Sequence, residues 1–239
     1  MTDAETKTDA ETKTDAETKT DAETMTNAET FKKNNFVIVR NFLDPFLVKY
    51  LASYYREVRD HGAGQFHTDW TSLNCNGDPA ADAVLYSLRS TIEAEIGLKL
   101  WPTYSFVRIY KKGDSVGRHK DSPANQISCN MNIARGDVDW PLGVSDGETN
   151  NSVIFQPGDA MIYRGFMLDH WRKKFQGDHQ VQLILGFVVQ DGRFYGLRIY
   201  GRGKPMYQPK GVRRAGPVKL TKAVLWRIRE AYRKRAGTE

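Results

Sequence analysis

Three residues of the 239-residue sequence have the types and spacing needed to hold one metal ion: His119, Asp121 and His170. His119 and Asp121 are two residues apart, and on an extended chain such side chains point to the same side. His170 follows a tight turn and a short apolar segment, residues 156–163, and adds a second imidazole. Two imidazoles and one carboxylate leave three positions of the metal open, which is typical of oxygen-activating Fe(II). Zinc is the rival ion, although catalytic zinc usually keeps one main open position.

Short apolar segments separated by turns predict the strands that must position these ligands. Turns such as Lys112-Gly113-Asp114 and Pro157-Gly158-Asp159 divide the segments. Many short strands at this spacing predict a mainly β fold with flanking helices, as a sandwich or a jelly-roll barrel. The strands are expected over residues 36–43, 104–110, 126–133, 152–155, 160–163 and 180–189.

Two helices are expected ahead of the main group of strands. Asp44 and Pro45 form a good start for the first helix, since Asp caps a helix and Pro fits its first turn. A second helix is expected over residues 81–96, with Gly97 as its stop. Residues 60–80 are rich in Gly, Asn and Asp and predict a loop.

The charge of the chain is divided unevenly and predicts three parts. Residues 1–33 are an acidic hexapeptide array, Thr-Asp-Ala-Glu-Thr-Lys, with too few apolar side chains to offset the entropy of ordering. We therefore expect a disordered leader, with order beginning near Phe36. Residues 34–200 would form the catalytic domain. Residues 201–239 would form a basic linker, Gly201 to Gly216, and an amphipathic helix, Pro217 to Ala236.

The composition also restricts where the protein works. There are two cysteines, and an intracellular protein with reduced thiols, in the cytoplasm, is the simplest interpretation. No apolar stretch approaches the length of a membrane span, and the N-terminus has no secretory-signal pattern. The net charge of +6 comes from the tail, since the segment 193–239 carries +12. Such a tail can contact nucleic acid, acidic protein or anionic lipid, or it can be a solvated surface.

At the His119-x-Asp121 motif and His170 the chain resembles the iron(II)/2-oxoglutarate dioxygenases, and within them the prolyl-4-hydroxylase-like group. The resemblance covers Phe36 to Val189 and includes the opening strand, the Asp-Pro helix and the Pro-Gly-Asp turn. It implies a double-stranded β-helix, which is a distorted jelly roll with the metal at one mouth. It also implies a dioxygenase that uses Fe(II), 2-oxoglutarate and O2 and releases succinate and CO2. Because relatives that halogenate lack the carboxylate of Asp121, hydroxylation is favoured.

The same resemblance points to residues that would bind 2-oxoglutarate. Tyr110 and Asn132 match positions that donate hydrogen bonds to the cosubstrate in similar enzymes. Arg108 is a further candidate for binding the cosubstrate. Relatives usually place an Arg or Lys about ten residues after the second histidine, and that position falls here on His179, which alternation predicts to face the barrel interior. A neutral imidazole holds a carboxylate weakly, so we expect Arg172 to assist, since guanidinium binds carboxylates through two hydrogen bonds.

The substrate remains open, because the sequence does not distinguish an amino acid or peptide from a small metabolite or a nucleobase. The resemblance favours an amino-acid, peptide or small-molecule substrate. One alternative is an oxygenase that modifies nucleic acid, suggested by the basic tail 201–239 but not favoured, because residues 32–192 are neutral overall. Another alternative is a jelly roll that binds a ligand without catalysis. The oligomeric state is not predicted.

Overall fold

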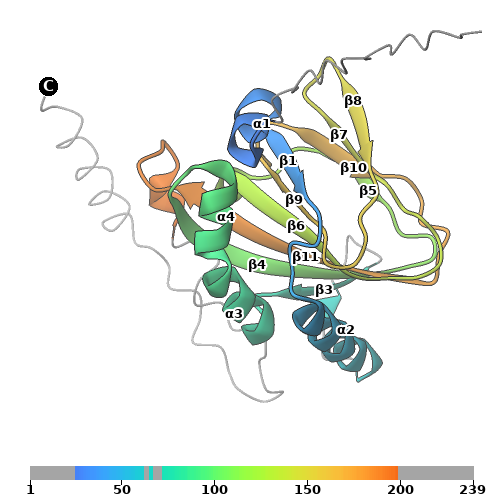
Figure 1. Cartoon of the computed structure of the whole chain (residues 1–239). Coiled ribbons are helices and arrows are strands. Elements are labelled where there is room, and N and C mark those ends of the chain that lie inside the picture. Colours follow the sequence, from blue (N-terminus) through green and yellow to red (C-terminus); the bar gives the residue numbers. More distant parts are fainter. Residues whose placement is uncertain (1–24, 62–64, 67–71, 199–239) are drawn as a thin grey trace, which may run out of the picture.

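The computed structural model describes residues 25–61, 65–66 and 72–198. Within these residues the chain is mainly antiparallel β structure, with helices against one side of it (Figure 1). The predicted C-terminal helix and most of the acidic leader lie outside the described residues. The α-helices are α1 (Asn27–Asn34), α2 (Pro45–Asp60), α3 (Pro79–Ser87) and α4 (Arg89–Ile96), and the short 3-10 helices are η1 (Pro123–Asn125) and η2 (Tyr195–Leu197).

The strands form a large sheet and a small sheet, both antiparallel. The large sheet has the order β1-β9-β6-β11-β4-β3-β2, and the small sheet has the order β5-β10-β7-β8. The large sheet consists of β1 (Phe36–Val39), β2 (Gln65–Phe66), β3 (Leu73–Asn76), β4 (Leu100–Lys111), β6 (Ile127–Arg135), β9 (Ala160–Tyr163) and β11 (His179–Val189). The small sheet consists of β5 (Val116–His119), β7 (Leu142–Ser145), β8 (Asn150–Val153) and β10 (Asp169–Arg172).

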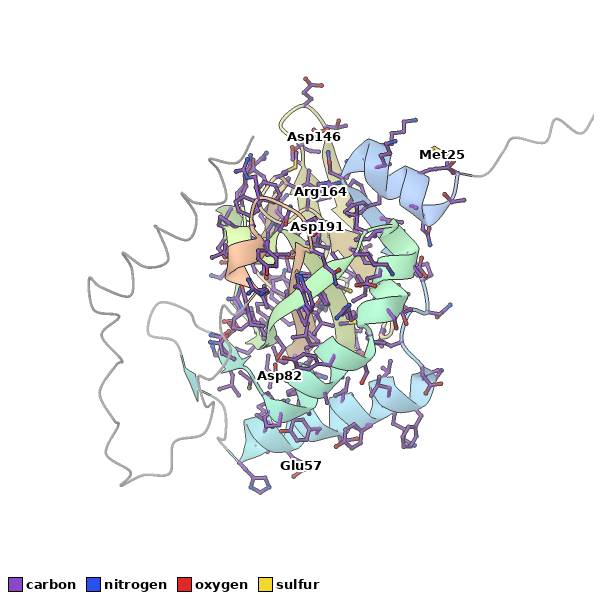
Figure 2. The ribbon with its side chains drawn as sticks, turned by 90° about the vertical axis from the view of Figure 1, so that its left-hand side faces the viewer. Met25, Glu57, Asp82, Asp146, Arg164 and Asp191 are labelled. Atoms are coloured by element: carbon purple, nitrogen blue, oxygen red, sulfur yellow. The ribbon has the colours of Figure 1, made fainter. Side chains whose placement is uncertain are left out.

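The two faces of the large sheet have different neighbours. One face packs under the helices, where Leu51 and Tyr55 of α2 join Val181 and Leu183 of β11 in the main hydrophobic core. Figure 2 shows the helices along one side of the strands, with Met25 ahead of α1 and Glu57 on α2. The other face looks toward the small sheet, and a second apolar cluster lies between the two sheets. The predicted mainly β jelly roll with flanking helices is confirmed.

Helix α1 corrects the prediction that order begins near Phe36. Thr26 caps the helix with a capping box shared with Glu29, and Asn35 ends it in the left-handed conformation. Phe31, the one large apolar side chain of this helix, is 1% exposed in the main core. The boundary predicted at residue 33 is therefore wrong, because one well-placed aromatic side chain and two caps are enough to order the last repeat.

One expected helix and one expected loop also differ from the sequence-based expectation. The helix expected over 81–96 is divided into α3 and α4 at Leu88, so that each short helix buries its own apolar residues, while Gly97 ends α4 in the left-handed conformation as predicted. The loop expected over 60–80 contains β3, whose Asn74 and Cys75 are buried against β4. Pairing with a central strand overrides the low strand propensity of Asn.

No helix in the described part of the chain is long and apolar enough to cross a membrane. Cys75 and Cys129 are both buried and both free.

Candidate metal centre

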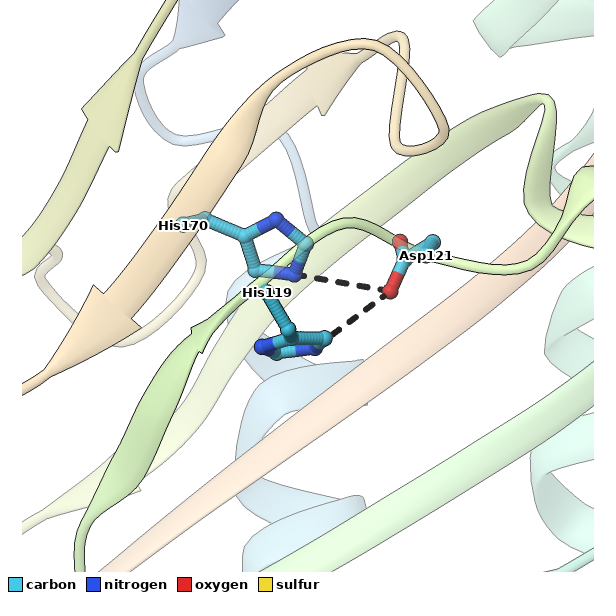
Figure 3. Close-up of side chains that lie close together, drawn as sticks. All are labelled: His119, Asp121 and His170. Atoms are coloured by element: carbon cyan, nitrogen blue, oxygen red, sulfur yellow. Dashed lines mark ion pairs between the residues drawn. The ribbon is translucent and has the colours of Figure 1, made fainter.

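The three predicted ligands meet between the two sheets (Figure 3). His119 is the last residue of β5, His170 lies in the neighbouring strand β10 directly opposite it, and Asp121 follows β5 in a loop. One oxygen of Asp121, Oδ1, lies 3.7 Å from Nε2 of His119 and 3.4 Å from Nε2 of His170. One nitrogen or oxygen of each residue lies within 4.8 Å of the others. The structure thus brings all three together.

Backbone carbonyls orient both imidazole rings. Nδ1 of His119 lies 2.8 Å from the carbonyl oxygen of Gly117, and Nδ1 of His170 lies 3.1 Å from that of Leu168. A carbonyl only accepts, so each Nδ1 carries a proton, and Nε2 is the nitrogen that each ring turns toward Asp121 and can offer to a metal. This arrangement is the one in which histidine binds metals, with the second nitrogen held by a neighbouring acceptor.

The carboxylate of Asp121 is held from its other side. Its Oδ2 accepts a hydrogen bond from Ser128 Oγ at 2.7 Å and one from Tyr163 Oη at 3.5 Å, which leaves Oδ1 to face the imidazoles. Burial alone would raise the pKa of Asp121, but contact with His170 and the Ser128 hydrogen bond outweigh burial, and the pKa lies below its usual value. The group is therefore an anion at neutral pH, as a metal ligand must be.

The donor set fits a divalent metal. With bonds of about 2.1 Å to nitrogen or oxygen, two ligand atoms at right angles lie roughly 3 Å apart. The separations of 3.4 and 3.7 Å need only a small contraction to reach that value. His119 keeps 46% of its side chain exposed, so the centre is open to a cavity on one side. His119, Asp121 and His170 could thus hold an iron ion with positions left for other ligands.

A cavity of about 510 Å³ extends from the triad between the sheets. Arg172, two residues after His170, lies in its wall and is 3% exposed. Its Nη1 donates to the carbonyl oxygen of Trp140, and its guanidinium lies 4.7 Å from the Trp140 ring. Its Nη2 is buried without a hydrogen-bond partner among the described residues. Burial lowers the pKa of Arg172 to about 10, so it remains a cation at neutral pH.

Tyr110 lies in the same cavity wall, on β4, and is 4% exposed. Its ring packs edge-on against Trp140 at 4.8 Å and lies under the guanidinium of Arg108 at 4.8 Å. Burial raises the pKa of Tyr110, so the hydroxyl keeps its proton and can donate a hydrogen bond. The structure therefore places Tyr110 and Arg172 together, at the same cavity as the triad.

Asn132 is placed differently from the expectation. Its side chain is fully buried and donates from Nδ2 to the carbonyl oxygen of Phe155, and the residue does not line the cavity. Asn130, two residues earlier on the same face of β6, lines the cavity instead. Oδ1 of Asn130 and of Asn132 and both polar atoms of the Gln182 side chain are buried without partners among the described residues. The interior between the sheets is thus polar and suited to a polar ligand.

The prediction that His179 faces the barrel interior is wrong. His179 lines a different hollow, beside Arg56 and Arg59 of α2, and its Nδ1 lies 3.3 Å from Asp178. Its strand neighbours Val181 and Leu183 belong to the core under the helices. Side chains alternate along β11 as predicted, but its apolar face packs on the helices, and the face toward the metal carries polar residues such as Gln182.

Sequence reasoning missed three residues around Asp121: Ser128, Tyr163 and Gly165. The backbone N–H of Asp121 donates to the carbonyl oxygen of Gly165 at 2.8 Å. A β-carbon at Gly165 would lie 2.3 Å from Asp121 Oδ2 and 2.7 Å from Ser128 Oγ. No pattern in the sequence marks these residues, since they lie on or beside strands that meet Asp121 only in the folded protein.

The sequence matches no protein-family model and no curated protein. The fold, in contrast, matches solved structures. A prolyl-4-hydroxylase from Pseudomonas putida is 17% identical with a TM-score of 0.57, and the match covers 67% of this chain and 96% of that one. A prolyl hydroxylase from Trichoplax adhaerens, solved with a peptide of hypoxia inducible factor, is 14% identical with a TM-score of 0.57, covering 71% and 90%.

A third match is HygX from Streptomyces hygroscopicus, solved with nickel, 2-oxoglutarate and hygromycin B bound. It is 8% identical with a TM-score of 0.55, and the match covers 68% of this chain and 86% of that one. The chain thus has the fold of the 2-oxoglutarate/iron(II) oxygenases, which confirms the predicted double-stranded β-helix and supports the resemblance to prolyl-4-hydroxylases.

Proposed function

We propose that this protein is an Fe(II)/2-oxoglutarate-dependent dioxygenase that hydroxylates an amino-acid, peptide or small-molecule substrate. One observation supports it most: a two-histidine, one-carboxylate triad and a buried guanidinium with an unpaired nitrogen line the same cavity. The triad is suited to the metal, and the guanidinium is suited to a carboxylate at the other end of a small dianion.

In this proposal His119, Asp121 and His170 hold the iron, and Arg172 binds the distal carboxylate of 2-oxoglutarate. Tyr110 donates a hydrogen bond beside Arg172, and Asn130 takes the place in the cavity wall that was expected for Asn132. When bound, iron, 2-oxoglutarate and O2 together supply the oxidising power, with release of succinate and CO2. The protein's part is to fix these groups relative to the substrate and to limit access of water.

The size of the cavity supports a small substrate or a single side chain of a peptide. Its volume of about 510 Å³ falls within the range of sites for small molecules, which spans roughly 300 to 1,000 Å³. An oxygenase that modifies nucleic acid is the alternative, and the tail at 201–239 that suggested it lies outside the described residues. A cytoplasmic location stays a prediction.

The test is turnover under defined conditions. Protein purified without oxygen and loaded with Fe(II) should convert 2-oxoglutarate to succinate when O2 is admitted, and pools of amino acids, peptides and metabolites should reveal a product heavier by one oxygen atom. An absence of succinate from protein that contains iron, across all pools, would contradict the proposal.

A further inference from the structure

The ligands of the candidate metal centre are held in place by two different sheets. His119 and His170 belong to the small sheet, where they pair directly across β5 and β10. Asp121 lies in the loop that follows β5, and its side chain and backbone are held by residues of the large sheet and the turn after it. The relative position of the carboxylate and the imidazoles therefore depends on contacts that join the two sheets.

Two hydroxyl groups make those contacts through the same oxygen atom. Ser128 of β6 is 0% exposed and Tyr163 of β9 is 1% exposed, and both donate to Oδ2 of Asp121. Ser128 and Tyr163 lie opposite each other in the β6–β9 pairing, which fixes their hydroxyls side by side. The Tyr163 ring also packs edge-on against the His170 ring at 5.2 Å, so it contacts two of the three ligands.

Oδ2 of Asp121 accepts hydrogen bonds and is also tightly packed. Gly165 lies so close that a β-carbon there would approach Oδ2 to 2.3 Å. Because its backbone carbonyl also accepts from the Asp121 N–H, the loop is fastened at the backbone while the carboxylate is fastened at one oxygen. Oδ1 is the oxygen that remains, and it faces both Nε2 atoms.

We infer that Ser128 and Tyr163 are positioning residues that make Asp121 a ligand through Oδ1 alone. The inference rests on the proposed metal site. A carboxylate that bound through both oxygens would occupy one more position on the metal, and that position would be lost to the cosubstrate or O2. Hydrogen bonds to the second oxygen prevent this and fix the direction of the first, as partners of metal ligands commonly do.

The experiment measures metal binding, without turnover, and uses Co(II) as the probe because its visible absorption reports the number and arrangement of its ligands. The variants are Ser128→Ala, Tyr163→Phe and the double variant. The controls are Ser152→Ala and Tyr50→Phe, which remove hydroxyls from exposed residues of β8 and α2. Affinity is read by competition with a chelator, and the unfolding temperature without metal is recorded for each variant.

We expect Ser128→Ala to weaken Co(II) binding about tenfold and the double variant to weaken it further, within the roughly 10- to 100-fold loss usual for such partners. The visible spectrum of the double variant should change, and the controls should match the wild type. Gly165→Ala should weaken binding at least as much, because its methyl group displaces the carboxylate.

Two results are distinguishable. If the wild type itself does not bind Co(II), the proposed metal site fails, and this inference fails with it. If the wild type binds Co(II), but Ser128→Ala and Tyr163→Phe bind it with unchanged affinity and spectrum, the metal site stands and the positioning role is overturned. Should the double variant not fold, the single variants decide the matter, since each removes only one oxygen atom.

Discussion

The guanidinium of Arg172 is a buried cation with one nitrogen left unpaired. Burying a charge is unfavourable unless an opposite charge or hydrogen bonds offset the loss of water. Nη1 has the Trp140 carbonyl, while Nη2 has no partner among the described residues. A carboxylate at Nη2 would supply the missing hydrogen-bond acceptor and an opposite charge. Arg172 lies two residues beyond His170, so its guanidinium is in the wall of the same cavity as the metal ligands.

We predict that Arg172→Gln raises the concentration of 2-oxoglutarate needed for half-saturation at least tenfold, equivalent to about 1.4 kcal/mol. His179→Ala should leave the saturation curve unchanged, because His179 lies on the helix-covered face of β11. The measurement is succinate production against 2-oxoglutarate concentration for both variants. Equal curves for Arg172→Gln and the wild type would remove Arg172 from the site.

At the residue scale, the types and order of the ligands could be predicted from the sequence, while their supports could not. His119 and Asp121 are close in the chain, so their spacing carries the information directly. Ser128, Tyr163 and Gly165 reach Asp121 only through strand pairing and a turn, and serine, tyrosine and glycine are common in such places for other reasons. The face of His179 was missed because both faces of β11 are buried, and period alone does not say which one faces the metal.

At the element scale, α1 shows how a short helix is fixed to the body of the protein. We predict that Phe31→Ala lowers the free energy of unfolding by about 3–5 kcal/mol, because the ring is fully buried in the main core. Met25→Ala is the matched control, since Met25 is 43% exposed and precedes the same helix. Urea denaturation of both variants checks this. A loss below about 1 kcal/mol for Phe31→Ala would mean that α1 is dispensable.

The turn between β8 and β9 depends on Asp159. The carboxylate accepts from the backbone N–H groups of Gln156 and Asn41 at 2.8 and 3.0 Å and from Arg40 at 2.6 Å. It thereby joins the turn to the chain segment that follows β1. Burial would raise the pKa of Asp159, but these hydrogen bonds outweigh it, and the pKa lies below its usual value.

We predict that Asp159→Asn lowers the free energy of unfolding by about 2 kcal/mol at neutral pH, in the range for hydrogen bonds to a charged group. Since the folded state lowers the pKa, the contribution is present above the unfolded pKa of about 3.9 and is lost as the pH falls through the folded value. As the pH is lowered below about 4, the free energy of unfolding should therefore fall less in the variant than in the wild type, and the difference between the two proteins should shrink. Urea titrations at several pH values test this, with Asp137→Asn at an exposed position as control. Parallel pH curves for the wild type and Asp159→Asn would contradict it.

Helices and strands could be predicted from the sequence where interactions between neighbouring residues form them, and could not where pairing with a distant strand forms them. Helix α2 begins at Pro45, as predicted, because Asp44 caps it by accepting from the N–H groups of Phe46 and Leu47. Strand β3 was missed because its Asn-rich sequence becomes a strand only by pairing with β4. Strand β7 was missed for the same reason, since its short sequence gains its pairing from β8 and β10.

At the scale of the whole molecule, the two sheets divide the work of building the site. The small sheet carries both histidines and Arg172, and the large sheet supplies the hydroxyls that hold Asp121 and the wall that contains Tyr110. The helices cover the opposite face of the large sheet and keep it in place.

The central claim is that one cavity binds iron and 2-oxoglutarate together, and a calorimetric titration without oxygen tests it most directly. The wild type loaded with Fe(II) should bind one 2-oxoglutarate per chain, and metal-free protein should bind it far more weakly. His170→Ala and Asp121→Ala, if folded as judged by their unfolding temperature without metal, should bind neither Fe(II) nor 2-oxoglutarate tightly. Binding of 2-oxoglutarate that is the same with and without iron, or the same in the wild type and both variants, would contradict the account.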